Sequence, residues 1–546
     1  MSPTRHLPSL ILLTCSAVMA QAPAPGLRLY APFGTFDTYL IDTNDQVVHT
    51  WTDTNTVGAS VYLEDDGTML RTVFLPGGPR VGGAAGGLRR FALDGTKTWD
   101  FRRGDLTTWS HHDVAPMPNG NVLMTVWERL TAADAIAAGR NPLLLGSNDW
   151  LPDAVIEVQQ TGPTSGTVVW EWRVMDHVVQ DFDPTQSNFG VVASHPELID
   201  VNYPQVILGD GEFNHINSID YDPKNDVILL GTPFQNEIWI IDHSTTTAEA
   251  AGHTGGNHGR GGDLLYRWGN PQAYRRGTPA DQQLYFQHGA EFIQPGRPGA
   301  GNVILFNNRA GALQGQSYSS AVEIVLPATF QLPAGQAFGP VAPVWEYTDP
   351  IPSDLYSPIV SSAERLPNGN TLICSGFQAG YTFEVDPAGN KVWEYLPTLP
   401  YPNLTFQASY VGDHMLWTDS TEWSVANGGT ITFDLIVGSP FAGRFYVLLG
   451  SASGTTPGFP LGAVNLPLNF DGYLETTINL ANVAPFGNTI GTLDANGRAT
   501  ATFSLPGGLL PPAAVGTELH HAFVLFDAGV VNIERASNAV PMVWVP

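Results

Sequence analysis

A short strand ending rich in tryptophan recurs six times in the first three quarters of the chain, and this repeat restricts the fold more than any other feature. The clearest copy is Trp-Glu-Tyr at residues 393–395, which follows a Pro-Asn-Gly-Asn turn at 367–370. The other copies lie at residues 48–51, 97–101, 169–172, 265–268 and 344–347. Repetition on this scale indicates an architecture in which each copy is one supersecondary unit.

Each copy can be divided into four strands. In the last copy we expect them at residues 361–366, 371–374, 381–385 and 391–395, because Asn-Gly between apolar runs is a strong hairpin signal. The third strands of the earlier copies are expected at residues 39–42, 91–94, 156–158, 238–242 and 322–325. Four-stranded units repeated around an axis form a β-propeller, so the sequence predicts an all-β fold with a six-bladed β-propeller.

The domain boundaries follow from where the repeat begins and ends. The first copy is short of strands, and residues 405–410 are expected to complete it and to close the ring, which gives a propeller at residues 27–415. Beyond about residue 421 the tryptophan ending is missing, charges are few, and residues 430–437 alternate in polarity. This pattern predicts a small C-terminal antiparallel β-sandwich domain at residues 425–546.

Two long stretches interrupt the repeat, at residues 130–153 and 176–212. The first is expected to contain a short helix that Thr131 caps. Loops of this length in a compact domain tend to be lids or binding loops, so both are candidates to cover a site.

The charge balance restricts the partners. The chain has 24 basic and 51 acidic residues and a net charge of −27, which repels nucleic acid and anionic membrane faces. We therefore expect a small-molecule partner and no nucleic acid, and the sequence carries no indication of oligomeric state. An anionic substrate would need a local cationic pocket in such a protein.

The N-terminus resembles an export signal. Arg5 and His6 precede an apolar run, and small residues follow near Ala20, which predicts a signal peptide at residues 1–20 and a periplasmic, cell-surface or extracellular protein. Cleavage there leaves Cys374 as the one cysteine, which excludes an intramolecular disulfide and a cysteine-based zinc cluster. No later segment has the ~20 apolar residues of a membrane span.

Propeller geometry brings distant histidines together. The first strand of each blade lines the channel, and its start lies at one mouth. The third, fourth and fifth copies have His112, His215 and His288 at that start, and Arg309 follows the second strand of the fifth. We prefer His112 to the adjacent His111, because neighbouring strand residues face opposite ways.

Imidazole and guanidinium groups that converge in an acidic protein suit an oxyanion. Sulfuryl or phosphoryl transfer fits this set, with His112, His215 and His288 as catalytic candidates and Arg309, Asn214 and Asn308 as substrate-binding candidates. A channel histidine can instead be a satisfied structural residue. Three imidazoles could bind zinc or copper, but the neighbouring Arg309 would repel a cation. A glycosidase would need two facing carboxylates, and Asp113 and Glu291 would then have to point into the channel. We expect no metal and no cofactor.

Three motifs carry a family resemblance. The runs at residues 111–121, 214–223 and 262–271 resemble the bacterial arylsulfotransferase (aryl-sulfate sulfotransferase) family, over roughly residues 27–397. The resemblance implies transfer of a sulfuryl group from a phenolic sulfate ester to another phenol, without the nucleotide donor PAPS. It also implies a transiently sulfated channel histidine, with His215, His288 and Arg309 holding the sulfate.

The sixth copy departs from the family pattern. Ser361 stands where a further channel histidine would be sought. Either His112, His215 or His288 is then the nucleophile, or transfer is direct, or the activity is lost. The alternative to an exported sulfotransferase is a non-catalytic secreted propeller that binds a ligand or a cell-surface partner at the same mouth.

Overall fold

The structure, a computed structural model, describes residues 21–64, 67–146, 149–204, 211–397, 404–412, 416–462 and 464–546. The predicted signal peptide lies outside these residues. The fold is all-β, as predicted, and its helices are short: α1 (Ala132–Ala137), α2 (Thr247–Ala250) and α3 (Gly472–Asn479). In the described part of the chain, no helix combines the length and apolar character needed to cross a membrane.

Between Leu27 and Val411, the described residues form six four-stranded antiparallel sheets, in each of which neighbouring strands pair in a simple series. The first sheet is β26 (Thr405–Val411), β1 (Leu27–Pro32), β2 (Asp37–Ile41) and β3 (Val47–Thr52). The second is β4 (Val57–Leu63), β5 (Met69–Phe74), β6 (Gly86–Phe91) and β7 (Lys97–Arg102). The third is β8 (Thr108–Pro116), β9 (Val122–Glu128), β10 (Asp153–Gly162) and β11 (Ser165–Arg173). The fourth is β14 (Ser218–Asp222), β15 (Val227–Thr232), β16 (Glu237–Asp242) and β17 (Tyr266–Trp268). The fifth is β18 (His288–Phe292), β19 (Val303–Asn307), β20 (Ser320–Ile324) and β21 (Trp345–Tyr347). The sixth is β22 (Ser362–Arg365), β23 (Thr371–Ser375), β24 (Tyr381–Val385) and β25 (Lys391–Tyr395).

Several local predictions are confirmed. β26 pairs with β1, so the strand after the sixth copy does complete the first sheet. Thr131 caps α1 through a capping box with Asp134. The third strand predicted at residues 91–94 was wrong in position: β6 ends at Phe91, because the amide of Ala92 donates to Thr96 and these residues turn the chain into β7.

Neighbouring sheets are joined in sequence through the strands that begin them. Tyr62 of β4 donates its hydroxyl proton to Asp113 of β8 at 2.7 Å, and the other oxygen of Asp113 accepts the amide N–H of Ile219 in β14 at 3.1 Å. The remaining links are Gln407 to Val61 (2.9 Å), Phe292 to Asp220 (2.7 Å), Arg297 to Glu364 (2.6 Å) and Tyr410 to Glu364 (2.7 Å). The Tyr410 link joins the sixth sheet to the first, so the chain of contacts closes on itself.

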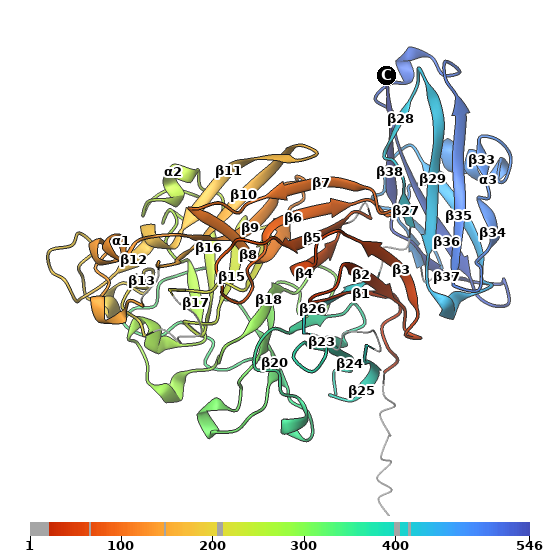
Figure 1. Cartoon of the computed structure of the whole chain (residues 1–546). Coiled ribbons are helices and arrows are strands. Elements are labelled where there is room, and N and C mark those ends of the chain that lie inside the picture. Colours follow the sequence, from red (N-terminus) through yellow and green to blue (C-terminus); the bar gives the residue numbers. More distant parts are fainter. Residues whose placement is uncertain are drawn as a thin grey trace, which may run out of the picture.

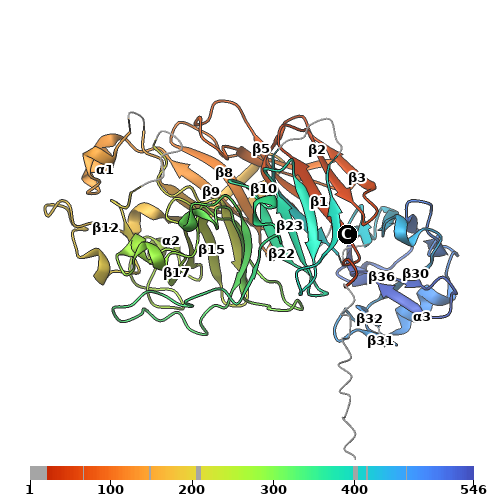
Figure 2. The ribbon, with the colours of Figure 1, turned by 90° about the horizontal axis from the view of Figure 1, so that it is seen from below.

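The C-terminal residues form two further sheets over one apolar core (Figures 1 and 2). One consists of β27 (Leu416–Thr418), β29 (Gly428–Ile436), β35 (Arg498–Pro506) and β33 (Phe486–Gly487). The other consists of β28 (Glu422–Ser424), β38 (Val540–Val545), β36 (Glu518–Phe526), β30 (Phe445–Ser451) and β34 (Ile490–Thr492), with β37 (Ile533–Ala536) beside β36. Two small two-stranded sheets pair β12 (Val178–Val179) with β13 (Ile199–Asp200) and β31 (Phe459–Leu461) with β32 (Val464–Leu466).

The C-terminal part stands beside β1, β2 and β3 and is attached to the first sheet (Figure 1). Ser439 donates both its amide and hydroxyl protons to Asp42, at 2.9 and 2.7 Å. Trp417 of β27 is fully buried in an apolar cluster with Leu27 and Leu29 of β1. A Cβ atom on Gly67 would come within 1.7 Å of the Trp417 ring, so the indole lies directly against that glycine.

Replacing Trp417 by alanine should destabilise the whole protein. Deletion of a buried tryptophan costs about 3–5 kcal/mol, and this one fills space between the first sheet and the C-terminal part. Chemical denaturation should therefore show a lower free energy of unfolding. The matched control is Leu509→Ala, at a side chain that is 62% exposed, which should unfold like the wild type. Equal stability of Trp417→Ala and Leu509→Ala would contradict this role.

Candidate active site

His215 lies just before β14 and is held by two neighbours. Its Nδ1 contacts the carboxylate of Glu212, and its ring stacks on Phe234 with centroids 4.7 Å apart and planes 4° from parallel. A carboxylate beside Nδ1 favours the tautomer that carries its proton there. The lone pair of His215 therefore lies on Nε2.

His112 is oriented through His111. The Nε2 atom of His111 lies 2.9 Å from Asp153, and its ring stacks on Trp127 at 4.0 Å. The two Nδ1 atoms of His111 and His112 lie 2.9 Å apart. A proton on Nε2 of His111, facing Asp153, leaves its Nδ1 as an acceptor, so His112 donates from Nδ1 and keeps its lone pair on Nε2.

The expectation that His111 faces away from His112 rested on strand alternation. The register of β8 against β9 shifts between Ser110 and Val114, and His112 has a left-handed φ of 43°. This bulge removes the alternation, so both imidazoles are buried and contact each other. A Cβ atom on Gly83 would lie 2.0 Å from Nε2 of His112, so the loop before β6 covers this ring closely.

His288 begins β18 and is oriented by Asn308. Its Nδ1 lies 2.9 Å from the side-chain oxygen of Asn308 and 3.1 Å from the carbonyl oxygen of Phe286. Both partners are acceptors, so Nδ1 carries the proton and Nε2 the lone pair. The Asn308 amide donates in turn to the carbonyl oxygens of Ser357 and Val360, both at 2.7 Å.

The three histidines predicted from the sequence lie at one place. The rings of His112 and His215 are 4.4 Å apart, in an edge-to-face arrangement. Phe406 of β26 lies 6.0 Å from the His112 ring and 6.3 Å from that of His288. Histidines from the third, fourth and fifth sheets therefore gather around an aromatic ring from the first.

Arg309 and Asn214 adjoin this cluster with unused polar atoms. The Arg309 guanidinium lies over the Phe286 ring at 4.1 Å, and its Nε donates to the carbonyl of Pro358 at 3.3 Å. Among the described residues it forms no ion pair within 4.0 Å. Asn214 is fully buried, and neither its side-chain oxygen nor its nitrogen has a hydrogen-bond partner in the described residues.

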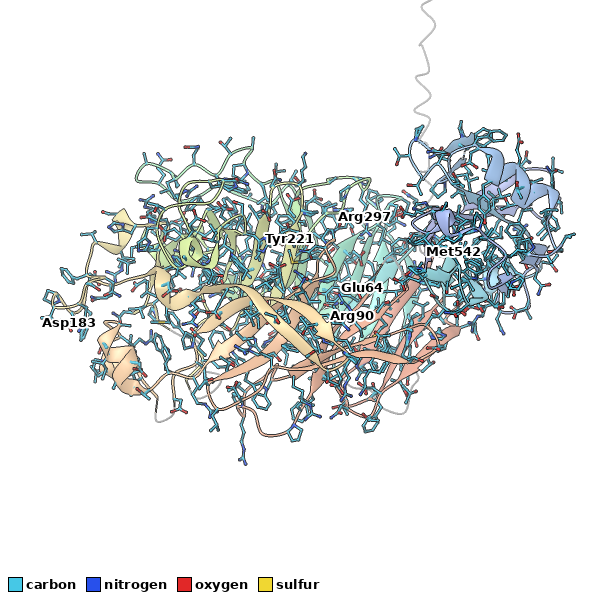
Figure 3. The ribbon with its side chains drawn as sticks, turned by 90° about the horizontal axis from the view of Figure 1, so that it is seen from above. Glu64, Arg90, Asp183, Tyr221, Arg297 and Met542 are labelled. Carbon is cyan, nitrogen blue, oxygen red and sulfur yellow. The ribbon has the colours of Figure 1, made fainter. Side chains whose placement is uncertain are left out.

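Two carboxylates of the site were not found from the sequence. Asp153 and Glu212 lie at the ends of the two insertions, where Glu212 stands three residues before His215. The short spacing between Glu212 and His215 was the one sequence feature that could have identified Glu212 as part of the site. Asp183, in the outer part of the second insertion, lies at the edge of the molecule opposite to Met542 (Figure 3).

A cavity of about 730 Å³ adjoins the site. Its lining includes Phe33, Phe74 and a glycine-rich loop from Pro76 to Ala84 that carries the exposed Arg80. Gly83, which packs on His112, belongs to this lining. The cavity therefore offers aromatic and cationic groups next to the glycine that covers His112.

Burial disfavours the charged forms of His111, His112 and His288. It lowers the pKa of His288 to about 3 and the pKa of His112 well below the ordinary value, and the neighbouring His215 acts in the same direction on both. Burial also lowers the pKa of His111, although Asp153 opposes this. Neutral imidazoles with free Nε2 lone pairs are competent nucleophiles and proton acceptors.

The low pKa of His288 should appear in the acid stability of the protein. In the unfolded chain this group binds a proton with a pKa near 6.5, but in the folded protein only near 3. The unfolded state therefore holds more protons between these values, and the free energy of unfolding falls as pH drops through this window. At pH 4 the loss is about 3 kcal/mol for this residue.

His288→Gln should thus lose less stability than the wild type between pH 7 and pH 4, measured by denaturant unfolding at each pH. The control is Leu509→Ala, at a side chain that is 62% exposed and does not titrate, and it should keep the wild-type pH dependence. Identical pH profiles for His288→Gln and the wild type would contradict the buried neutral state.

Comparisons with known proteins agree with the sequence motifs. The family model for arylsulfotransferase (ASST) matches residues 37–395, which include His112, His215, His288 and Arg309. No curated protein matches the chain. Among solved structures, the chain is similar to dihydro-heme d1 dehydrogenase NirN, at 10% identity over 96% of this chain and 74% of that chain with a TM-score of 0.29. It is also similar to AztD from Citrobacter koseri, at 10% identity over 70% of this chain and 98% of that chain with a TM-score of 0.32. Because the family model matches more than half of the chain, the chain belongs to the arylsulfotransferase family.

Proposed function

We propose that this protein is an exported sulfotransferase that moves a sulfuryl group from an aryl sulfate ester to a phenolic acceptor through a sulfohistidine. The observation that carries the proposal is the set of three buried imidazoles, each held at Nδ1, beside a guanidinium without an ion-pair partner in the described residues. Family membership supports the reaction class.

The scaffold we propose is a six-bladed β-propeller at residues 27–415, followed by a β-sandwich domain at 425–546. Six four-stranded sheets and the closed series of contacts between them support the propeller. The two C-terminal sheets with a shared core support the sandwich. Export rests on the signal-like residues 1–20.

His215 is the best candidate for the nucleophile. Attack by its Nε2 on sulfur forms an N–S bond, breaks the S–O bond to the aryl group, and leaves positive charge on the ring. The Glu212 carboxylate at Nδ1 stabilises that charge, as an orienting carboxylate does in other histidine-based sites. His288 has a neutral amide in this position, and Gly83 covers Nε2 of His112. Both are therefore weaker candidates.

Arg309 and Asn214 suit the sulfuryl oxygens. The planar guanidinium offers donors to an oxyanion, and the Asn214 amide has a donor without a partner in the described residues. The Asn308 amide is occupied by His288, Ser357 and Val360, so we assign it to positioning His288 rather than to substrate binding. Aromatic parts of the donor and acceptor fit the cavity lined by Phe33 and Phe74.

His288 suits proton transfer. An anionic sulfate ester beside this ring raises its pKa, so Nε2 takes up a proton from solvent as the ester binds. The proton then passes to the aryl oxide as the S–O bond breaks. In the second half of the reaction the acceptor phenol returns a proton to His288, its oxygen attacks sulfur, and the N–S bond to His215 breaks.

The covalent step predicts a sulfated enzyme. After mixing with 4-nitrophenyl sulfate in the absence of acceptor, the intact mass of the wild type should increase by one sulfuryl group, and peptide mapping should locate it at His215. His215→Ala should lack this adduct and the transfer activity, whereas the exposed control His195→Ala should keep both. A sulfated His215→Ala protein would refute the assignment, and an unmodified, inactive wild type would favour the non-catalytic alternative.

The proton-transfer role predicts a dependence on the leaving group. His288→Ala should slow transfer by about 10²–10⁴-fold from an unsubstituted phenyl sulfate, because a basic aryl oxide needs a proton. Transfer from 4-nitrophenyl sulfate should suffer much less, because nitrophenoxide leaves without one. Rates measured over a series of substituted phenyl sulfates give this comparison. An equal loss for all donors would leave His288 with a positioning role alone.

A further inference from the structure

A second cluster of histidine and carboxylate groups lies away from the proposed sulfuryl site. His177 follows β11 in the third sheet, and His253 and Asp263 lie between α2 and β17 in the fourth. One ligand atom from each residue lies within 4.8 Å of the other two. The Nδ1 atoms of His177 and His253 are 2.9 and 2.7 Å from the same oxygen of Asp263.

The hydrogen bonds of His177 fix which ring nitrogen faces Asp263. Its Nε2 lies 2.7 Å from the carbonyl oxygen of Ala250, an acceptor, so Nε2 carries a proton. Its Nδ1 therefore faces the carboxylate of Asp263 at 2.9 Å. A lone pair on Nδ1 and one on the carboxylate oxygen would repel each other at this distance, so a proton or a metal ion must lie between them.

The contact of His177 with Ala250 is typical of metal-binding histidines. Such histidines usually donate the other ring N–H to a backbone carbonyl or a carboxylate, which fixes the ring and its tautomer. The His177 ring also stacks on Trp172, with planes 4° from parallel and centroids 5.6 Å apart. The Nδ1 atom is therefore held in one direction.

The backbone next to Asp263 is packed so closely that position 262 accommodates only glycine. A Cβ atom on Gly262 would lie 2.0 Å from the Ala250 carbonyl oxygen and 2.6 Å from Nε2 of His177. The Gly262 carbonyl accepts the indole N–H of Trp172 at 2.7 Å. These contacts fix the segment that carries Asp263 against His177 before any ligand binds.

The cluster is open to solvent on one side. The side chains of His177 and Asp263 are 0% and 8% exposed, but that of His253 is 60% exposed. The nearby cation Arg260 directs its guanidinium to the carbonyl oxygens of Leu264 and Phe330. An ion can thus reach the buried carboxylate past His253.

We propose that His177, His253 and Asp263 bind a divalent transition-metal ion of the zinc class. Two imidazole nitrogens and one carboxylate oxygen are borderline ligands that suit zinc, and a water or a further carboxylate would complete a tetrahedral site. Asp176 directly precedes His177 in the chain. The ion would tie the third sheet to the fourth. This site is independent of the proposed sulfuryl transfer and revises the expectation of a metal-free protein.

The test is a zinc titration of the full chain after treatment with a chelator, by calorimetry and by metal analysis of the washed protein. Wild type should bind one more equivalent of zinc than His253→Ala, or bind it at least about tenfold more tightly. Zinc should also raise the thermal midpoint of the wild type more than that of the variant. The exposed position of His253 makes the substitution compatible with folding.

His258→Ala is the matched control, because it removes an imidazole from the same segment but outside the cluster, and it should bind zinc like the wild type. The histidines of the sulfuryl site are present in all three proteins, so their zinc binding cancels in the comparison. Equal stoichiometry and affinity in wild type and His253→Ala, including no binding by either, would overturn the proposal.

Discussion

The site depends on how the strands that begin the six sheets are held to one another. Asp113 is buried and Asp220 is partly buried, and the carboxylate of each accepts an amide proton from the next sheet. Burial is unfavourable for their charged forms and raises the pKa of Asp113 to about 6 and that of Asp220 to about 7. Asp113 directly follows His112, and it accepts a hydrogen bond from Ile219, which lies four residues after His215. This hydrogen bond therefore links the third sheet to the fourth close to the two histidines, whose rings lie 4.4 Å apart.

The backbone at the site departs from regular strand geometry in several sheets. His112 and His215 have φ values of 43° and 58°, Gly289 has 59°, and Val360 and Ser361 have 54° and 92°. Non-glycine residues rarely adopt this left-handed region, and they cluster at functional sites where the surrounding structure holds them. The sixth sheet keeps the distortion although it carries Ser361 instead of a histidine. The hydroxyl of Ser361 donates to Ser357 and accepts the amide N–H of Gly376, so this side chain links the two backbone segments on either side of it.

Much of the fold could be predicted because local chemistry encodes it. Asn-Gly turns and tryptophan endings located the strands of the sixth sheet within one or two residues, and the shortage of strands in the first copy identified β26. The convergence of His112, His215 and His288 followed from equivalent positions in the repeat. The family resemblance was carried by long motifs and is confirmed by the family model.

The remaining features of the site depend on tertiary contacts that a repeat does not encode. The pairing of His111 with His112 needs the bulge in β8, which a rule of strict alternation cannot anticipate. Asp153 and Glu212 come from insertions outside the repeat, where no equivalent position in another copy draws attention to them. Gly83 matters through its lack of a side chain over His112, a requirement that appears only when the loop is folded.

The second insertion connects the two histidine sites. Its second residue is His177, in the cluster with Asp263, and its last is Glu212, which contacts His215. Between these ends it is fastened to the fourth sheet, because Leu264 donates its amide proton to Glu197 at 3.0 Å and Arg267 donates to Leu198 at 2.8 Å. Leu264 is adjacent to Asp263, so the contact that fixes the insertion begins one residue from the proposed metal ligand. An ion at His177 would therefore stabilise the start of the segment whose end holds the carboxylate that orients His215. The site draws its histidines and Arg309 from the six-sheet repeat, but its two carboxylates, Asp153 and Glu212, come from the insertions.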